Sequence, residues 1–408
     1  MPHFISSLDE LETTAPRHVL VLYSGGVDGS YLLQWLARRR IEVTALQVRI
    51  GEAGEVDSDL AKRRAATFGV SLHTVDASQE FFTRFLPPAI HADAYYQGQY
   101  PVGSTLTRPL MAKVAVDVAG QFGCDAVAHT ATYTQNSSLR LSASLAALDR
   151  ELVVAAPFLG SHIPREVKVQ VLQEAGIGFD MGVYSVDANP WARVIESGGV
   201  EDPEVTLDET VFTWTRDIDD CPAGGTEIEL RFAGGLPVEL DGQPTTLGDL
   251  VPVLNELGGL HGVGRFSGLE DTPFGVKNHE VREAPAATVI TTAHRALANA
   301  VYGMREHTIR AALAREWTDL VVHGGWYGHL AQSLSRCLAD LDEPLTGTLG
   351  LRLHRGAVRV LRLKSENGLY YSRFGQDFTR WMSGYSYGPW LTQATIADAV
   401  RSGHDGLW

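Results

Sequence analysis

The chain has 408 residues, 44% of them hydrophobic, which suffices for two or three domains with a sizeable core. A formal net charge of −15 argues against nucleic acid as a standing partner, because clustered lysine and arginine hold phosphate backbones. No apolar run approaches the ~20 residues of a membrane span, and acids stand near the start where a signal peptide has bases. We therefore expect a cytoplasmic protein with no membrane partner.

A glycine turn near the start carries the strongest signal. The apolar run His18–Tyr23 precedes Ser24-Gly-Gly-Val-Asp-Gly-Ser30, and the helix-like Tyr31–Arg38 follows. A strand, a glycine turn and a helix start in this order build a nest of backbone N–H groups at a positive helix end, which binds phosphate. The alternative is an ordinary turn between a strand and a helix.

The side chains of this turn indicate which phosphate chemistry is served. Ser24 and Ser30 add hydroxyl donors, and Asp28 stands where it could cap the helix or orient Mg²⁺. The pattern S-G-G-x-D-x-S is typical of enzymes that split ATP into AMP and pyrophosphate. Because the Gly-Lys-Ser/Thr ending of a P-loop is missing, transfer of the γ-phosphate is disfavoured.

Strand and helix signals continue to alternate along the first third of the chain. This alternation predicts a parallel sheet covered on both faces, with ATP at the carboxyl edge of its strands. The expected strands are Glu42–Arg49, Val70–Val75, Asp125–His129 and Leu152–Ala156, and the expected helices include Asp57–Phe68 and Leu110–Phe122.

The pattern changes near Pro190. Thr226–Val238 and Leu349–Leu363 alternate apolar and polar residues, as antiparallel strands do, and Ala293–Leu341 between them is helical in composition. The fold class is therefore α/β, with a parallel-sheet nucleotide-binding domain followed by an α+β domain and a C-terminal arm. We place these parts at residues 1–180, 181–364 and 365–408. The aromatic-rich arm packs either on another subunit or on its own core.

The cysteines and histidines indicate no metal site. Cys124, Cys221 and Cys337 stand far apart, so neither a zinc site nor a disulfide framework is expected. The histidines show no ligand spacing. Pyrophosphate-loop enzymes that thiolate RNA commonly use paired or reactive cysteines, so that class is disfavoured.

Several further motifs, in this order and with these gaps, resemble the argininosuccinate synthase family from about residue 18 to about residue 373. They are Tyr100–Pro109, Asp125–His129, Val153–Pro157, Tyr184–Asn189, Gly199–Pro203, His261–Arg265 and Thr292–Leu297. The resemblance implies a pyrophosphate-loop domain followed by a synthetase domain, in a homo-oligomer, either a tetramer or a dimer. It also implies adenylation of the ureido oxygen of citrulline, after which the amine of aspartate displaces AMP.

The resemblance assigns roles to individual residues. Asp28, Ser24 and Ser30 carry the chemistry, with ATP and Mg²⁺ as cofactors. The nucleotide is bound by Leu22, Tyr23, Ser24, Gly25, Gly26, Val27, Asp28, Gly29, Ser30, Val48, His129 and Thr130, with Val48 near adenine. The substrates are bound by Tyr100, Thr105, Thr132, Asn136, Ser137, Arg140, Ser185, Val194, Glu270 and Arg282. Arg140 is the natural carboxylate clamp, with a solvated surface arginine as the alternative.

The chain departs from the family where substrates are bound. In the segment His129–Arg140, three family glycines are replaced by Thr130, Tyr133 and Gln135, and the aspartate that helps recognise the aspartate substrate is replaced by Ser137. In the citrulline pocket, a family serine aligns with Val194 and a tyrosine with Arg282. Valine cannot donate a hydrogen bond, and arginine puts a fixed cation where a neutral urea should lie.

The sequence thus predicts an ATP-dependent ligase of the argininosuccinate synthase type, with substrates other than citrulline and aspartate. The expected partners are an amino-acid-like or carboxylic-acid small molecule and an amine. Two alternatives stay open: a true argininosuccinate synthase with an unusual loop, and a catalytically silent nucleotide-binding paralogue. For Arg282, pairing with a substrate carboxylate competes with folding back onto Glu270, Glu280 or Glu283.

Overall fold

The computed structural model describes residues 3–51, 57–133, 136–179, 184–272, 274–370 and 372. The described chain up to Asn367 forms one compact unit. The C-terminal arm from Tyr371 onwards lies outside the described residues, apart from Ser372. Thr134 and Gln135 of the segment His129–Arg140 lie outside them as well. In the part of the chain that is described, no helix is long and apolar enough to cross a membrane.

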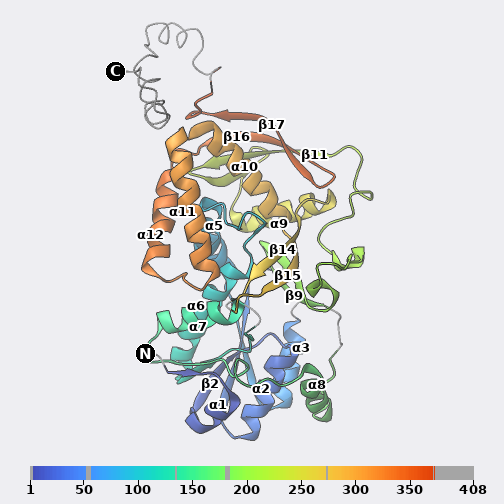
Figure 1. Ribbon diagram of the computed structural model, residues 1–408, viewed down its shortest axis with the longest axis vertical. Helices are drawn as coiled ribbons and strands as arrows, with labels where there is room; N and C mark the ends of the chain where they lie inside the picture. Colours follow the sequence, from blue (N-terminus) through green and yellow to red (C-terminus); the bar gives the residue numbers. More distant parts are fainter. Residues whose placement is uncertain are drawn as a thin grey trace, which may run out of the picture. The chain divides into compact units, whose positions relative to one another are not determined.

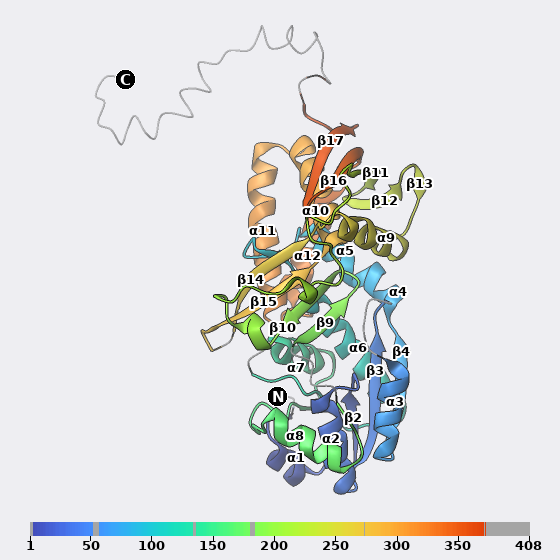
Figure 2. The same cartoon turned by 90° about the vertical axis from the view of Figure 1, so that its right-hand side faces the viewer.

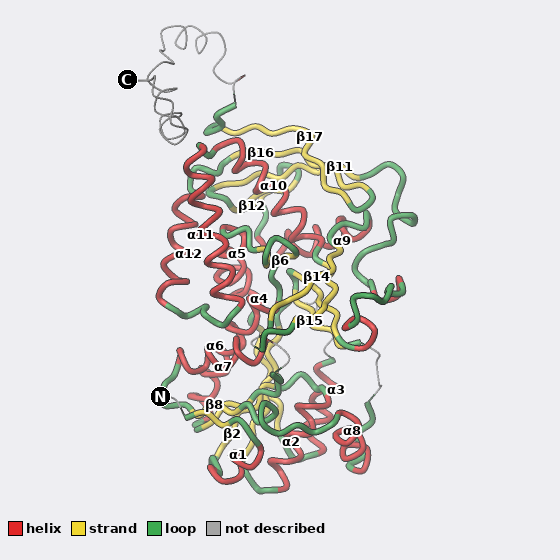
Figure 3. The backbone as a smooth tube through the Cα atoms, viewed as in Figure 1, coloured by secondary structure: helices red, strands yellow, loops and turns green. Residues whose placement is uncertain are grey.

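A six-stranded parallel sheet occupies the N-terminal part of the chain, with the strand order β1-β8-β7-β2-β3-β4. Figure 3 shows these strands gathered between helices. The strands are β1 (Phe4–Ile5), β2 (His18–Leu22), β3 (Glu42–Arg49), β4 (Ser71–Asp76), β7 (Ala126–Ala128) and β8 (Val153–Ala155). The parallel sheet expected from the sequence is confirmed.

Helices cover both faces of this sheet. The central strand β2 presents apolar side chains to both faces, because its alternate residues point in opposite directions. Val19 and Val21 pack among helices α1, α2 and α3, whereas Leu20 and Leu22 pack on the other face with α6 and α7. Figures 1 and 2 show α1, α2 and α3 close to β2, β3 and β4. These helices are α1 (Leu8–Thr14), α2 (Val27–Arg38), α3 (Ser58–Thr67), α6 (Ser104–Phe122) and α7 (Asn136–Leu148).

Two antiparallel sheets follow after residue 184. One has the order β14-β15-β10-β9 and the other β13-β12-β11-β16-β17. Their strands are β9 (Ser185–Asn189), β10 (Ala192–Glu196), β11 (Thr226–Ala233), β12 (Leu236–Leu240), β13 (Gln243–Pro244), β14 (Arg265–Asp271), β15 (Lys277–Glu283), β16 (Gly347–His354) and β17 (Ala357–Ser365). The antiparallel strands expected around Thr226–Val238 and Leu349–Leu363 are present, whereas the first of these two sheets was not foreseen.

The remaining elements connect or cover these sheets. They are α4 (Ser78–Glu80), η1 (Phe81–Phe85), α5 (Leu86–His91), β5 (Tyr95–Tyr96), β6 (Tyr100–Pro101), α8 (Arg165–Glu174), η2 (Gly198–Glu201), η3 (Glu209–Val211), α9 (Leu247–Leu260), α10 (Pro285–Val301), α11 (Met304–Val322) and α12 (His329–Asp342). The single helical stretch expected over Ala293–Leu341 is three helices. Gly303 and Gly328, both with extended backbone, precede α11 and α12 and interrupt it.

The fully buried carboxylate of Asp342, at the end of α12, connects this helix to α5, α10 and α11. Its Oδ2 lies 2.9 Å from Nδ1 of His91 and 2.8 Å from Nε2 of His294, and its Oδ1 accepts from the Tyr302 hydroxyl and from Nε of Arg310 at 3.1 Å. Burial alone would raise the pKa of Asp342, but hydrogen bonds from the two histidines hold it well below its usual range. The charged carboxylate therefore ties α5, α10, α11 and α12 together.

We predict that Asp342→Asn lowers the free energy of unfolding by about 3–5 kcal/mol, because it removes the buried negative charge that pairs with Arg310 and replaces one of the two acceptor oxygens by an N–H donor. Urea unfolding followed by circular dichroism measures the change. The matched control is Asp340→Asn, an exposed aspartate on the same helix, for which we expect less than ~0.5 kcal/mol. Equal effects of the two substitutions would contradict the assignment.

Candidate active site

The predicted phosphate turn lies between β2 and α2, at the carboxyl end of the parallel sheet. Gly25 has φ +84°, and a Cβ there would come 3.0 Å from that of Ala61. A Cβ on Gly29 would come 2.7 Å from the ring of Tyr23, whose hydroxyl lies 2.9 Å from that of Ser30. Both glycines are therefore required by the packing of the turn. Gly26 is the N-cap residue of α2 and has no side chain to accept a hydrogen bond. The first N–H groups of the helix are therefore available to bind an anion.

Asp28 does not cap α2, although capping was one of its two expected roles. It lies in the first turn of the helix, where its Oδ1 accepts a hydrogen bond from the ammonium of Lys168 at 2.8 Å. Lys168 reaches it from α8, is almost fully buried and lies 4.1 Å over the ring of Phe158. The carboxylate next to the predicted phosphate turn is thus paired with the ammonium of a lysine.

Three further nucleotide-site candidates lie at or just beyond the ends of neighbouring strands. Val48 lies near the end of β3, and His129 and Thr130 come directly after β7. Since β3 and β7 flank β2 in the parallel sheet, all three lie at the same edge as the phosphate turn. Burial, with the charge of Arg108 adding to it, lowers the pKa of His129 to about 4. The neutral imidazole therefore brings no charge to a phosphate.

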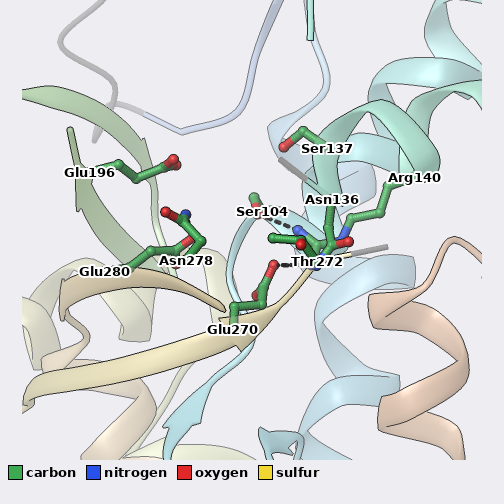
Figure 4. Close-up of a pocket in the computed structure, with 9 residues that line it drawn as sticks. All are labelled: Ser104, Asn136, Ser137, Arg140, Glu196, Glu270, Thr272, Asn278 and Glu280. Atoms are coloured by element: carbon green, nitrogen blue, oxygen red, sulfur yellow. Dashed lines mark hydrogen bonds and ion pairs between the residues drawn. The ribbon is translucent and has the colours of Figure 1, made fainter. Parts of the chain in front are cut away.

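A polar cavity lies where α7 meets the first antiparallel sheet, and Figure 4 shows the side chains around it. It is lined by Ser104, Asn136, Ser137, Arg140, Glu196, Glu270, Thr272, Asn278 and Glu280. Four of these, Asn136, Ser137, Arg140 and Glu270, are predicted substrate-binding residues that stand up to 134 positions apart in sequence. The fold thus gathers them at one place.

The carboxylate of Glu270 is the centre of this cavity wall. Its Oε1 accepts from the amide of Asn136 at 2.8 Å and from Arg140 at 2.9 Å, and its Oε2 lies 3.4 Å from both Arg282 and the Tyr100 hydroxyl. Burial works to raise the pKa of Glu270, but the two guanidinium charges and these hydrogen bonds bring it below its usual value. Glu270 is therefore a charged, fully engaged carboxylate.

Arg140 is buried and not a solvated surface residue. Its Nε donates to the carbonyl of Val322 at 2.8 Å, Nη1 to Ser104 at 2.9 Å and Nη2 to Glu270 at 2.9 Å. All three nitrogens are thus engaged with the protein. A substrate carboxylate bound by Arg140 would therefore share the guanidinium with these protein groups.

Arg282 folds back onto the protein's own carboxylates. Its Nη2 donates to Glu280 and lies 3.4 Å from Glu270, and its guanidinium carbon lies 3.9 Å over the ring of Tyr100. Glu283, the third acid considered, is bound instead by Arg193 at 2.8 Å. The geometry favours the reading in which Arg282 neutralises protein carboxylates, and it offers no support for pairing with a substrate acid.

The other predicted substrate residues lie around this cluster. Val194 on β10 is directly opposite Arg282 on β15, and Ser185 on β9 is opposite Glu196. Thr105 is buried in the first turn of α6, next to the cavity residue Ser104. Thr132 lies in the segment between β7 and α7.

Sequence reasoning missed several residues of the cavity. Ser104, Glu196, Thr272 and Asn278 line it without having been assigned a role, and Glu280 was considered only as a possible partner of Arg282. Arg108 was missed as well, although it binds Asp187 at 2.6 Å and reaches the cavity residue Ser137 at 3.3 Å. One signal was available: alternate residues of a strand share a face, so the acid and the base of Glu280-Val-Arg282 had to lie side by side.

Comparison with known proteins gives matches over both halves of the chain. The family model described as the arginosuccinate synthase N-terminal HUP domain matches residues 18–178, and the model of the C-terminal domain matches residues 184–377. The argininosuccinate synthase of Listeria innocua serovar 6a is 34% identical over 86% of this chain and 88% of its own length. That of Symbiobacterium thermophilum is 34% identical over 87% and 90%, respectively.

We predict that Arg282→Tyr lowers the free energy of unfolding by about 3–5 kcal/mol, because it leaves the buried Glu280 without its guanidinium partner. Chemical denaturation measures the change. The control is Arg362→Tyr, which breaks the exposed ion pair with Glu229 and should cost less than ~1 kcal/mol. A stable Arg282→Tyr variant with a raised KM would instead show that Arg282 binds substrate.

Proposed function

Because the chain belongs to the argininosuccinate synthase family of ATP-dependent carbon–nitrogen ligases, we propose that it joins an amine to an adenylated substrate other than citrulline. In this proposal, a ureido or carboxyl oxygen of the first substrate attacks the α-phosphorus of ATP. The bond to pyrophosphate breaks, and the amine then attacks the activated carbon and releases AMP.

The phosphate turn supplies what the first step needs. The uncapped N–H groups of α2 and the exposed hydroxyl of Ser24 can hold the β- and γ-phosphates still while the pyrophosphate leaves. The hydroxyl of Ser30, expected as a further donor, is instead fully buried and lies 2.9 Å from that of Tyr23. Mg²⁺, when bound, neutralises the charge of those phosphates. Asp28 is the carboxylate placed to orient it once the ammonium of Lys168 gives way.

The change of substrate rests on one observation: Val194 and Arg282, the two departures in the expected citrulline pocket, are direct partners on adjacent strands. They stand 88 positions apart in sequence, yet they replace two polar groups on one patch of the sheet. The arginine is then committed to Glu280 and Glu270. The two substitutions therefore support a pocket that has changed to bind a different ligand. Two unrelated substitutions would not be expected to fall on adjacent strand positions.

We predict that the protein cleaves Mg·ATP to AMP and pyrophosphate when supplied with candidate acids, ureas and amines, and that Asp28→Ala abolishes this turnover. Loss of the carboxylate removes the group that orients the metal ion. Separation of nucleotides by chromatography distinguishes the products. Asp9→Ala is the matched control, since Asp9 is also the second residue of its helix. Formation of ADP and phosphate would refute the proposal, and no turnover with any pair would favour a silent paralogue.

We also predict that citrulline with aspartate is a poor substrate pair, with kcat/KM below ~10⁴ M⁻¹s⁻¹, because Ser137, Val194 and Arg282 replace groups that recognise them. Steady-state kinetics with coupled pyrophosphate detection measures this. A value within the ordinary range of metabolic enzymes would identify a true argininosuccinate synthase with an unusual loop.

A further inference from the structure

A nearly buried ammonium group lies beside the phosphate turn. Lys168, on α8, is only 5% exposed, and its Nζ donates to Oδ1 of Asp28 at 2.8 Å. Asp28 is the second residue of α2, and the N-terminal N–H groups of that helix have no side-chain cap. The ammonium is therefore held at the end of the helix where an anion would bind.

The packing of α8 against α2 keeps the ammonium at this position. Val169 and Leu172 of α8 pack with Val27, the first residue of α2. Figures 1 and 2 show the two helices close together. The ammonium also lies 4.1 Å over the ring of Phe158, which is itself 2% exposed. Because the lysine stem is enclosed by apolar groups, its charge is confined to the neighbourhood of the turn.

The ion pair with Asp28 leaves the ammonium able to form further hydrogen bonds. An ammonium group has three N–H donors, and in the described part of the chain Asp28 is the one hydrogen-bond acceptor of Lys168. A nearly buried donor without an acceptor is costly. A phosphate oxygen at the start of α2 would supply the missing acceptor.

The same ion pair removes an electrostatic obstacle to phosphate binding. Without Lys168, the carboxylate of Asp28 would repel a polyphosphate that approaches the first N–H groups of α2. Arg64 brings a second cation beside the turn, but its two Nη groups donate to the carbonyl oxygens of Gly25 and Gly178 at 2.8 and 2.9 Å. Lys168 is therefore the better placed of the two cations to meet a phosphate.

We propose that Lys168 is a phosphate-binding residue: its ammonium neutralises Asp28 in the free protein and donates to an oxygen of the pyrophosphate part of ATP in the complex. The inference rests on the proposed function only in that it takes this turn as the ATP site. The turn's own residues could not indicate it, since Lys168 stands 140 positions from Asp28.

Inorganic pyrophosphate tests the proposal when it is titrated into the full-length protein by isothermal titration calorimetry. EDTA in the buffer removes divalent metal ions, so the protein's own cations determine the affinity. We expect Lys168→Met to raise the Kd about tenfold or more, because it removes one charge-assisted contact. The backbone of the turn should stay intact in this variant, since its geometry depends on its glycines.

The matched control is Lys364→Met, which removes the same charge from an exposed position of β17 and should leave the Kd unchanged. An unchanged Kd in a folded Lys168→Met variant would overturn the proposal. So would the lack of saturable pyrophosphate binding by the unaltered protein.

A second comparison separates direct contact from neutralisation of Asp28. In an Asp28→Asn background there is no carboxylate to neutralise, so adding Lys168→Met still raises the Kd about tenfold only if the ammonium contacts pyrophosphate. The double variant leaves neither charge without its partner, so it serves even if Lys168→Met alone does not fold. Equal Kd values for Asp28→Asn and the double variant would overturn the direct contact.

These titrations measure binding without turnover, so their outcome is separable from that of the proposed function. If ATP is cleaved to AMP and pyrophosphate but the Lys168 variants bind pyrophosphate normally, only the inference about Lys168 fails. If those variants lose affinity for pyrophosphate but ADP and phosphate are formed, the proposed function fails and the role of Lys168 stands.

Discussion

The buried carboxylate of Glu270 is the contact on which the candidate site depends. Tyr100, Asn136, Arg140 and Arg282 all reach it from three elements, β6, α7 and β15, and Glu270 itself lies on β14. Its charge is costly to bury, and it is kept because two guanidinium groups and an amide surround it. Replacing one residue of this ionic cluster would leave a buried charge without a partner and would destabilise the protein. Substitutions that alter the cavity are therefore expected to involve several of these residues together.

Much of the parallel-sheet part could be predicted because its signals are local. The alternation of apolar strands with helices, and the glycines of the Ser24–Ser30 turn, are properties of short segments. Each is enforced by backbone geometry, as at Gly25 with its φ of +84°. Helix boundaries were less accurate: α6 begins at Ser104 and runs through Pro109, where a propensity argument sees a break. Packing of its apolar residues against the sheet outweighs the proline.

The substrate cavity was harder to predict because its interactions join residues that are distant in sequence. The roles suggested for Asn136, Arg140 and Glu270 came from resemblance, which places residues without saying what they touch. The resemblance suggested a clamp at Arg140, whereas its three nitrogens bind protein groups. Likewise, only the register of β10 against β15 places Val194 opposite Arg282. Strand register follows from tertiary packing and is not encoded in either strand alone.

The two halves of the site differ in how freely they can change. The phosphate turn acts through backbone N–H groups and needs only glycines and a helix start, so substitutions elsewhere leave it intact. The cavity acts through side chains, and there each carboxylate requires a compensating partner. Replacing a neutral group by Arg282 in a buried position is tolerated only with an acid such as Glu280 beside it, and the two share one face of β15. An ion pair of this kind holds both of its side chains in place, so a change at either position affects the whole cavity wall.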